Sequence, residues 1–276
     1  MKAFISVDLE GMPYVVRPEH LSLKGSLYEE ARRIATRVTR VVAEALRENG
    51  FEEVLVADSH GPMVNLLVDE LPEYVGLIRG YPRPLAMVVG VEDCEAALFL
   101  GYHAKAGTTH STFDHTYSGA CIASLEINGV EASEFLLNAY VAGYYDVPVI
   151  LVAGEARLLE ADVALYTPWA ERVALKRSFS RYASYSPSMS RIEGMLREAV
   201  GNACRNYRQG LTKPLKTSEP VTIKVRFTRS GYADMAELLP GSSRIDGVTV
   251  KYTAKDIIEA YKVFQLVVAA SAGIPG

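Results

Sequence analysis

Short, almost wholly apolar segments alternate with longer amphipathic segments in the first half of this chain, and this alternation restricts the fold more than any other feature. Continuous apolar runs of this kind are typical of strands that are covered on both faces. Their alternation with helical segments is typical of a parallel sheet. The expected strands are residues 3–7, 53–57, 96–101 and 147–153. We therefore predict the α/β class, with a mainly parallel sheet flanked by helices.

The segment between the first two apolar runs is predicted to be a long amphipathic helix, residues 28–48. Its apolar side chains recur at helical spacing and fall on one face: Ile34, Val38, Val41, Val42 and Ala45. Asn49 and Gly50 follow and supply a stop signal. We expect this helix to cover one face of the sheet.

A second strand–helix unit is predicted around residue 130. Residues 120–127 have strand character, and Asn128-Gly129 is a favourable two-residue turn. Ser133 is a suitable N-cap for a helix over residues 134–144.

The pattern changes after Gly154. Helices are expected at residues 157–169, 190–207 and 255–271, strands at 221–228 and 247–252, and a Ser/Tyr-rich stretch at 178–190. We therefore predict an α/β domain over residues 1–155 and a smaller α+β domain over residues 156–276.

Charge and hydropathy exclude two classes of partner. The chain has 29 basic and 33 acidic residues and a net charge of −4, whereas general nucleic-acid binding needs a basic surface. Its apolar runs are shorter than the roughly 20 residues needed to span a bilayer, and its first residues do not have the pattern of a secretory signal. We expect neither nucleic acid nor membrane as a partner.

The three cysteines, Cys94, Cys121 and Cys204, are far apart and form no CxxC pair. Their odd number and wide spacing do not suit a disulfide framework or a thiolate metal site. Three reduced cysteines are typical of a cytoplasmic protein, and we expect that location.

Chemistry-bearing residues follow three of the expected strands. Asp8 and Glu10 come after the first, Asp58 and His60 after the second, and His103 after the third. Ligand sites in open parallel sheets lie beyond the carboxyl ends of the strands. Each residue also has an ordinary structural explanation, because an aspartate can cap a turn and a histidine can be a hydrogen-bonded surface residue. Their shared placement at the carboxyl ends of the strands favours a ligand-binding or catalytic site.

Two further groups extend this candidate site. Glu134 lies in the first turn of a predicted helix, where the helix dipole favours a carboxylate, so it is either a ligand or simply a good helix start. His110 and His115 lie in the loop after His103. We interpret His110 as an exposed loop residue and His20, in a charged segment, as structural or solvated.

The donor types indicate a metal centre. Carboxylates and imidazoles without thiolates suit Zn²⁺, Mn²⁺ or Fe²⁺. Three carboxylates and two imidazoles exceed what one catalytic zinc usually takes. They would suffice for two metals about 3.5–4 Å apart that share a carboxylate. The sequence has no GxGxxG, P-loop, GxSxG or HExxH motif that would support a nucleotide-binding, serine-hydrolase or zincin-type alternative.

Five motifs in order give the chain a resemblance to the zinc-dependent D-aminopeptidase family. They are SVDLEG at 6–11, ADSHG at 57–61, LGYHAKAGT at 100–108, DHTYSG at 114–119 and LNAYVAGYYDVPV at 137–149. The resemblance runs in register to about residue 155 and more weakly to the C-terminal helix. It implies a two-zinc aminopeptidase that acts on short peptides with an N-terminal D-residue. We also expect aminoacyl amides as substrates and Mn²⁺ or Co²⁺ as alternative metals.

The same resemblance implies roles for individual residues. The metal ligands would be Asp8, Glu10, His60, His103 and Glu134, with Asp8 bridging the two metals. His115 matches the catalytic histidine proposed for the family. The family also suggests a homo-oligomer, a ring-shaped decamer that encloses its active sites. We therefore expect residues 1–155 to form a metal-binding catalytic domain and residues 156–276 to shape the substrate site and the oligomer contacts.

Two alternative functions remain open at this point. Another two-metal hydrolase, an amidase or a phosphoesterase, could use the same donors. A phosphoesterase usually needs cationic groups around the phosphate, and Lys105 is the only basic residue near these motifs. The other alternative is an inactive oligomer that binds metal and peptide.

Overall fold

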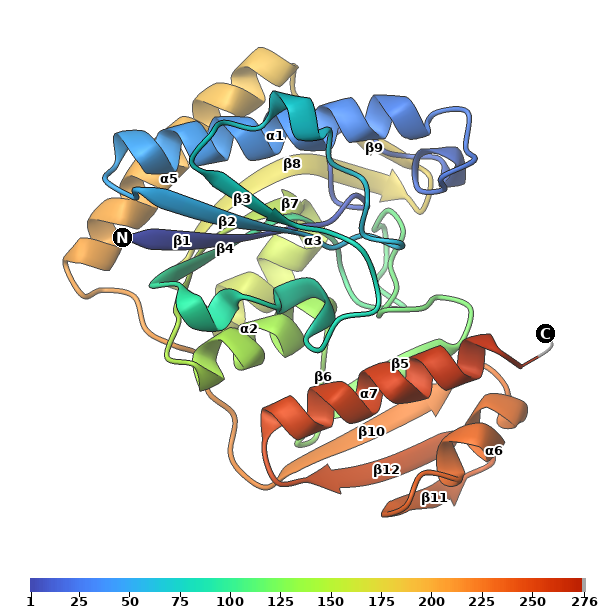
Figure 1. The fold of residues 1–276 in the computed structure, drawn as a ribbon. Coiled ribbons are helices and arrows are strands. Elements are labelled where there is room, and N and C mark those ends of the chain that lie inside the picture. Colours follow the sequence, from blue (N-terminus) through green and yellow to red (C-terminus); the bar gives the residue numbers. More distant parts are fainter. Residues whose placement is uncertain (275–276) are drawn as a thin grey trace.

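Seven strands form the first sheet of the computed structural model, which describes residues 1–274 (Figure 1). From edge to edge the strands are β3 (Val75–Ile78), β2 (Glu53–Asp58), β1 (Lys2–Val7), β4 (Ala96–Tyr102), β7 (Val149–Glu155), β8 (Glu171–Ser180) and β9 (Ala183–Tyr185). Neighbouring strands pair in parallel except β8 and β9, which are antiparallel. The predicted mainly parallel α/β sheet is confirmed.

Helices cover both faces of this sheet (Figure 1). Helices α1 (Tyr28–Glu48) and α5 (Met189–Arg208) pack together over one face, and α2 (Glu134–Tyr144) packs on β4 and β7 on the other. The predicted apolar face of α1 is buried, with its five residues at most 9% exposed. Burial of this apolar face against β1, β2 and β4 stabilises the helix and fixes its position on the sheet.

A second, antiparallel sheet lies below the first in Figure 1. Its strands are β11 (Ser242–Asp246), β12 (Thr249–Ala254), β10 (Val221–Phe227), β5 (Ile122–Ile127) and β6 (Val130–Glu131), in that spatial order. Helices α6 (Ser230–Glu237) and α7 (Ile257–Ala272) pack on it, and α7 also contacts α2. The helix layer of α2 and α7 therefore connects the two sheets.

Both sheets contain segments from either side of residue 155, where the boundary between the expected domains was placed. Strands β5 and β6 come before this residue but belong to the second sheet. Strands β8 and β9 come after it but extend the first sheet. The two sheets are thus interleaved along the chain rather than consecutive.

The segment after β7 differs from the prediction in two ways. The helix expected over 157–169 is shorter, and consists of α3 (Ala156–Leu158), a π-helical turn η5 (Leu159–Val163) and α4 (Ala164–Tyr166). Pro168 follows its end, and a proline cannot continue a helix. The predictions also missed β8 and β9, because the charged residues of β8 hide its strand character and β9 is a three-residue edge strand.

The remaining helices are single 3₁₀ turns in connecting loops: η1 (Pro18–His20), η2 (Val68–Glu70), η3 (Ala86–Val88) and η4 (Val91–Asp93). Within residues 1–274, no helix has the length and apolar character required to cross a membrane. All three cysteines are free and buried.

Candidate metal centre

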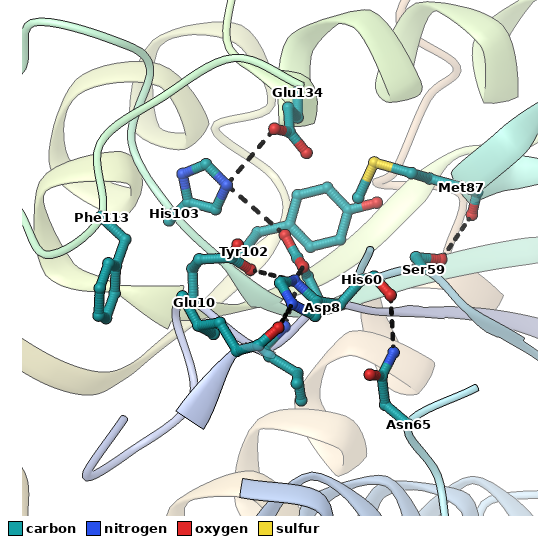
Figure 2. Close-up of polar contacts among 12 residues, drawn as sticks. Asp8, Glu10, Ser59, His60, Asn65, Met87, Tyr102, His103, Phe113 and Glu134 are labelled. Carbon is teal, nitrogen blue, oxygen red and sulfur yellow. Dashed lines mark hydrogen bonds and ion pairs between the residues drawn. The ribbon is translucent and has the colours of Figure 1, made fainter. Parts of the chain in front are cut away.

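The carboxyl ends of β1, β2 and β4 lie side by side because β1 is the middle strand of the three. Asp8 and Glu10 follow β1, His60 follows β2, and His103 follows β4. Glu134 approaches from the start of α2. The structure therefore brings together all five side chains predicted as metal ligands, in a buried cluster (Figure 2).

The turn after β1 is held tightly against the end of β4. The N–H of Asp8 donates to the carbonyl of Leu100 at 2.8 Å, and the N–H of Gly11 donates to that of Gly101 at 2.7 Å. A Cβ at Gly11 would lie 2.0 Å from the Tyr102 carbonyl oxygen, which is a clash with backbone. Glycine is therefore required at position 11 for the turn that carries Glu10 to lie against the end of β4.

Asp58 has a structural role. Its carboxylate accepts hydrogen bonds from the backbone N–H groups of Asn65 at 2.5 Å and Leu66 at 2.8 Å, and from the Asn65 amide at 2.6 Å. That amide also donates to the carbonyl of His60 at 2.8 Å. Asp58 thus shapes the loop that presents His60.

Two groups of three donors share Asp8. The ligand atoms of Asp8, Glu10 and His60 lie within 4.8 Å of one another, and so do those of Asp8, His103 and Glu134. One Asp8 oxygen, Oδ1, is 3.4 Å from Nδ1 of His60, and the other, Oδ2, is 3.6 Å from Nε2 of His103. Asp8 therefore faces both groups, as a bridging carboxylate would.

Backbone carbonyls orient the histidines. Nε2 of His60 lies 2.9 Å from the carbonyl of Leu21, and Nδ1 of His103 lies 3.0 Å from that of Ala104. A carbonyl can only accept, so each of these nitrogens carries a proton and the opposite nitrogen of each ring faces the carboxylates. Metal-binding histidines are usually fixed in this way.

The donor set fits a divalent metal. Among the described residues, Nε2 of His103 is buried and has no hydrogen-bond partner, although it lies 3.5 Å from Oε1 of Glu134. A buried polar atom without a partner is costly, and a metal ion would satisfy it. The three carboxylates and two imidazoles therefore suit two divalent cations better than an empty polar cluster.

The pKa values of the metal-free cluster are strongly shifted. Burial raises the pKa of Asp8, and the charge of Glu10 raises it further. Burial alone would lower the pKa of His103, but the adjacent charges of Glu134 and Asp8 raise it to about 10. The pKa of His60 is raised in the same way, against the effect of burial, mainly by Glu10. The cluster therefore favours positive charge at its centre.

Glu134 is positioned by the start of α2. Oγ of Ser133 accepts from the N–H of Leu136 at 3.2 Å and caps the helix, as predicted. Oε1 of Glu134 accepts from the N–H of Tyr117 at 2.7 Å. Burial would raise the pKa of Glu134, but His103 and His115 lower it, so the carboxylate is charged.

His115 lies beside the cluster and is more accessible. Its side chain is 18% exposed, and its Nε2 is 3.5 Å from Oε1 of Glu134 and 3.9 Å from Oε1 of Glu10. Nδ1 donates to the Phe113 carbonyl at 2.8 Å, so the Nε2 lone pair faces the site. Burial, helped by the charge of His103, lowers the pKa of His115 below its usual value. A third donor group of Glu10, His103 and His115 also has ligand spacing.

A cavity of about 230 Å³ lies beside the cluster, and part of its lining is formed by Asp8, Glu10, His60, His115 and Glu134. Its other walls are formed by apolar and aromatic side chains and by Gln265, contributed by four segments of the chain: Met63, Tyr81, Ala86, Met87, Tyr117, Gln265 and Val268. Gln265 and Val268 come from α7, which packs on the second sheet. The cluster of candidate ligands therefore forms one end of a pocket that a small substrate could enter.

The other histidines and Lys105 take no part in the cluster. His110 is exposed and its ring contacts the Phe179 carbonyl at 2.9 Å, so its interpretation as a loop residue is confirmed. His20 is buried and its Nδ1 lies 3.1 Å from the Arg17 backbone nitrogen, a structural contact. Nζ of Lys105 lies 3.6 Å from Asp162 and 3.8 Å from Glu131.

Sequence reasoning missed the residues that reach the site from a distance. Tyr117 lies within the DHTYSG motif, but nothing in the sequence indicates that it lines the cavity. Gln265 and Val268 sit in a helix whose apolar pattern indicates only core packing. Lys176, on the unpredicted strand β8, is fully buried beneath the turn that carries Glu10. Burial lowers the pKa of Lys176 to about 7.

The cluster has the donor types and spacing that a two-metal hydrolase site needs, and comparisons with known proteins identify the family. The family model for D-aminopeptidases matches residues 1–266, so the chain belongs to that family of peptidases.

A sequence comparison and a structure comparison, each with a Bacillus subtilis protein, agree with this assignment. The D-aminopeptidase of strain 168 is 37% identical over 265 residues, which are 95% of this chain and 94% of the relative. The solved structure of the Zn-dependent D-aminopeptidase DppA, described as a self-compartmentalizing protease, covers 100% of both chains with a TM-score of 0.95 and 33% identity. The resemblance and the peptidase activity predicted from the motifs are confirmed.

Proposed function

We propose that this chain is a zinc-dependent aminopeptidase that removes an N-terminal D-amino acid from short peptides or aminoacyl amides. Asp8, Glu10 and His60 would hold one zinc, and Asp8, His103 and Glu134 the other. The observation that carries this proposal is the position of Asp8, whose two oxygens face one group each. Mn²⁺ or Co²⁺ could replace zinc in the same donors.

The residues around the cluster support hydrolysis. Zinc pairs, when bound, activate water and polarise a carbonyl oxygen. His115 would accept and then return a proton at Nε2, which faces the site and has a lowered pKa. The Phe113 carbonyl holds the required tautomer by accepting from Nδ1. The pocket walls hold the substrate beside these groups.

Residues beyond position 155 support the proposal that the C-terminal part of the chain shapes the substrate site. Gln265 and Val268 line the cavity opposite the metal-binding cluster. Helix α7 brings them there by packing against α2, whose first residue is the proposed ligand Glu134.

The alternative activities are less well supported. A phosphoesterase needs cationic groups for the phosphate, and the described residues that line the cavity include neither lysine nor arginine. Lys105 is engaged by Asp162 and Glu131. An inactive binding protein would have no need for a proton-transfer group, whereas His115 lies beside the five donors here.

A substrate panel tests the function. The zinc-, manganese- and cobalt-loaded protein is assayed on matched D- and L-aminoacyl amides, on dipeptides and on a phosphate monoester. We expect release of the N-terminal D-residue and no phosphate release. Binding of D-peptides without cleavage would favour the inactive alternative, and cleavage of the phosphate ester alone would favour a phosphoesterase.

We also propose a homo-oligomer, in the form of a ring-shaped decamer, in the cytoplasm. The self-compartmentalizing relative supports the assembly. The three free, buried cysteines support a reducing compartment. Sedimentation-velocity measurement of the pure protein checks the assembly, and a monomer at micromolar concentration would contradict it.

A further inference from the structure

Lys176 is a fully buried lysine, with 0% of its surface exposed. Lysine is almost never buried in this way unless its charged end has partners. Nζ of Lys176 donates to two backbone carbonyls, those of Glu10 and Val15, the second at 2.6 Å. The side chain thus reaches from β8 to both ends of the 10–15 turn.

The neighbouring carboxylate on β7 does not account for this burial. Glu155 is aligned with Lys176 in the register of β7 and β8. Its own oxygens accept hydrogen bonds from Ser178 at 2.8 Å, Ser111 at 3.1 Å and the N–H of Arg157 at 2.7 Å. The hydrogen bonds of the Lys176 ammonium group are instead directed to the turn.

The turn is therefore fixed from two sides. Gly11 presses against the carbonyls of Gly101 and Tyr102 at the end of β4, and Lys176 bonds the carbonyls of residues 10 and 15. Between these contacts the Glu10 side chain is directed to His60, with Oε2 at 2.8 Å from Nδ1. Loss of the Lys176 donors would leave two buried carbonyls without partners and free the backbone of Glu10 to shift.

Lys176 also contacts the segment that carries His115. Its ammonium group lies 5.7 Å from the centre of the Phe113 ring. The carbonyl of that same residue accepts from Nδ1 of His115. One buried side chain thus touches the supports of both Glu10 and His115.

We propose that Lys176 is a positioning residue of the active site, which holds Glu10 in the geometry needed for zinc in the group formed with Asp8 and His60. This inference rests on the proposed function, because it takes Glu10 as a zinc ligand. If Lys176 only stabilised the core, its replacement would lower the stability of the protein without changing the affinity for one zinc ion relative to the other.

Zinc affinity distinguishes the two roles. Lys176→Met keeps an unbranched apolar stem and removes the donors. Supporting contacts behind metal ligands are typically worth about 10–100-fold in metal affinity. We therefore expect Lys176→Met to lower the affinity for one of the two zinc ions by about this factor. The affinity for the other zinc ion should equal that of the wild-type protein. Competition with a chromophoric chelator measures both affinities.

Three variants serve as references. Leu175→Ala removes a fully buried neighbour on β8 and should lower the melting temperature without altering either zinc affinity. Glu10→Gln and Glu134→Gln identify which binding step belongs to which group, and Lys176→Met should match the Glu10 pattern. Lys176→Arg keeps N–H donors at the end of the stem and should retain more zinc affinity than Lys176→Met.

The inference is overturned if Lys176→Met binds both zinc ions with wild-type affinity. It is also overturned if Lys176→Met and Leu175→Ala lose the same melting temperature and show the same zinc affinities. If Lys176→Met does not fold, Lys176→Gln, whose shorter side chain cannot reach both carbonyls, is judged by the same criteria. A wild-type protein that binds fewer than two zinc ions would instead count against the proposed function.

Discussion

The imidazole rings of His103 and His115 stack face to face, with an angle of 7° between their planes and their centres 4.2 Å apart. Both rings bind a backbone carbonyl through Nδ1, so both Nε2 atoms face Glu134, each at 3.5 Å from its Oε1. The two rings differ in access, because the side chain of His103 is 1% exposed and that of His115 is 18% exposed. We infer that the buried ring coordinates metal and that the accessible one transfers protons.

The first prediction separates these two roles. His115→Ala should retain both metals and lose about 10²–10⁴-fold in kcat, the usual contribution of general acid–base catalysis. His103→Ala and His60→Ala should lose metal first and activity as a consequence. Metal content and kcat are measured on the same preparations. Near-normal turnover in His115→Ala would end its catalytic role, and loss of metal would make His115 a ligand, as the third donor group allows.

A second prediction concerns Glu134. In Glu134→Gln the amide oxygen can still accept from the N–H of Tyr117, so the local structure should persist. The negative charge is lost, and zinc affinity should fall with it. If Glu134 served only the helix dipole, the change would cost just about 0.3–1 kcal/mol of stability. Zinc titration and turnover of the variant distinguish the ligand role from the helix-dipole role. Wild-type values for both measurements would refute the ligand role.

Removal of metal should abolish hydrolysis and lower stability. A ligand that binds only the folded state stabilises it, by about 2.7 kcal/mol at a free concentration of 100 times its Kd. We therefore expect the chelator-treated protein to be inactive and to regain both activity and melting temperature on addition of zinc. Full activity in a sample shown by metal analysis to be metal-free would contradict the account.

Zinc binding should release protons near neutral pH. The pKa of His103 in the metal-free protein is about 10, above the unfolded value of about 6.5. Its charged form therefore contributes stability that is complete below pH ~6.5 and is lost as pH rises toward about 10. Because zinc binds only the neutral ring, zinc affinity should rise with pH across the same interval.

Calorimetry tests this proton release. Zinc titrations near pH ~7.5, in two buffers with different ionisation enthalpies, should give different heats, equivalent to at least one proton per chain. Equal heats in the two buffers would show that His60 and His103 are already neutral in the metal-free protein.

The sequence predicted the site better than it predicted the connections around it. Asp8, Glu10, His60 and His103 follow apolar strands, and in a parallel sheet the strand order alone brings such positions together. Their roles as ligands stay predictions. The continuous apolar run that indicated β1, β2, β4 and β7 is absent from β8, where Arg172, Lys176 and Arg177 interrupt the apolar residues. The long-range partnership between Lys176 and the 10–15 turn therefore had no local signal.

The contribution of α7 to the pocket could not be predicted for a related reason. The predicted helix over 255–271 matches α7 well, but its periodicity says only that one face is buried. Which residues reach the cavity depends on how the second sheet packs against α2, and that packing joins segments more than a hundred residues apart. Gln265 and Val268 could thus be placed on a helix and not at the site.

Anomalous X-ray scattering at the zinc edge, from crystals of the zinc-loaded protein, tests the central claim most directly. We predict two peaks per chain about 3.5–4 Å apart. The Asp8 carboxylate should lie between them, with Glu10 and His60 on one zinc and His103 and Glu134 on the other. A single peak, or a pair of peaks that does not share Asp8, would contradict the proposed two-zinc site.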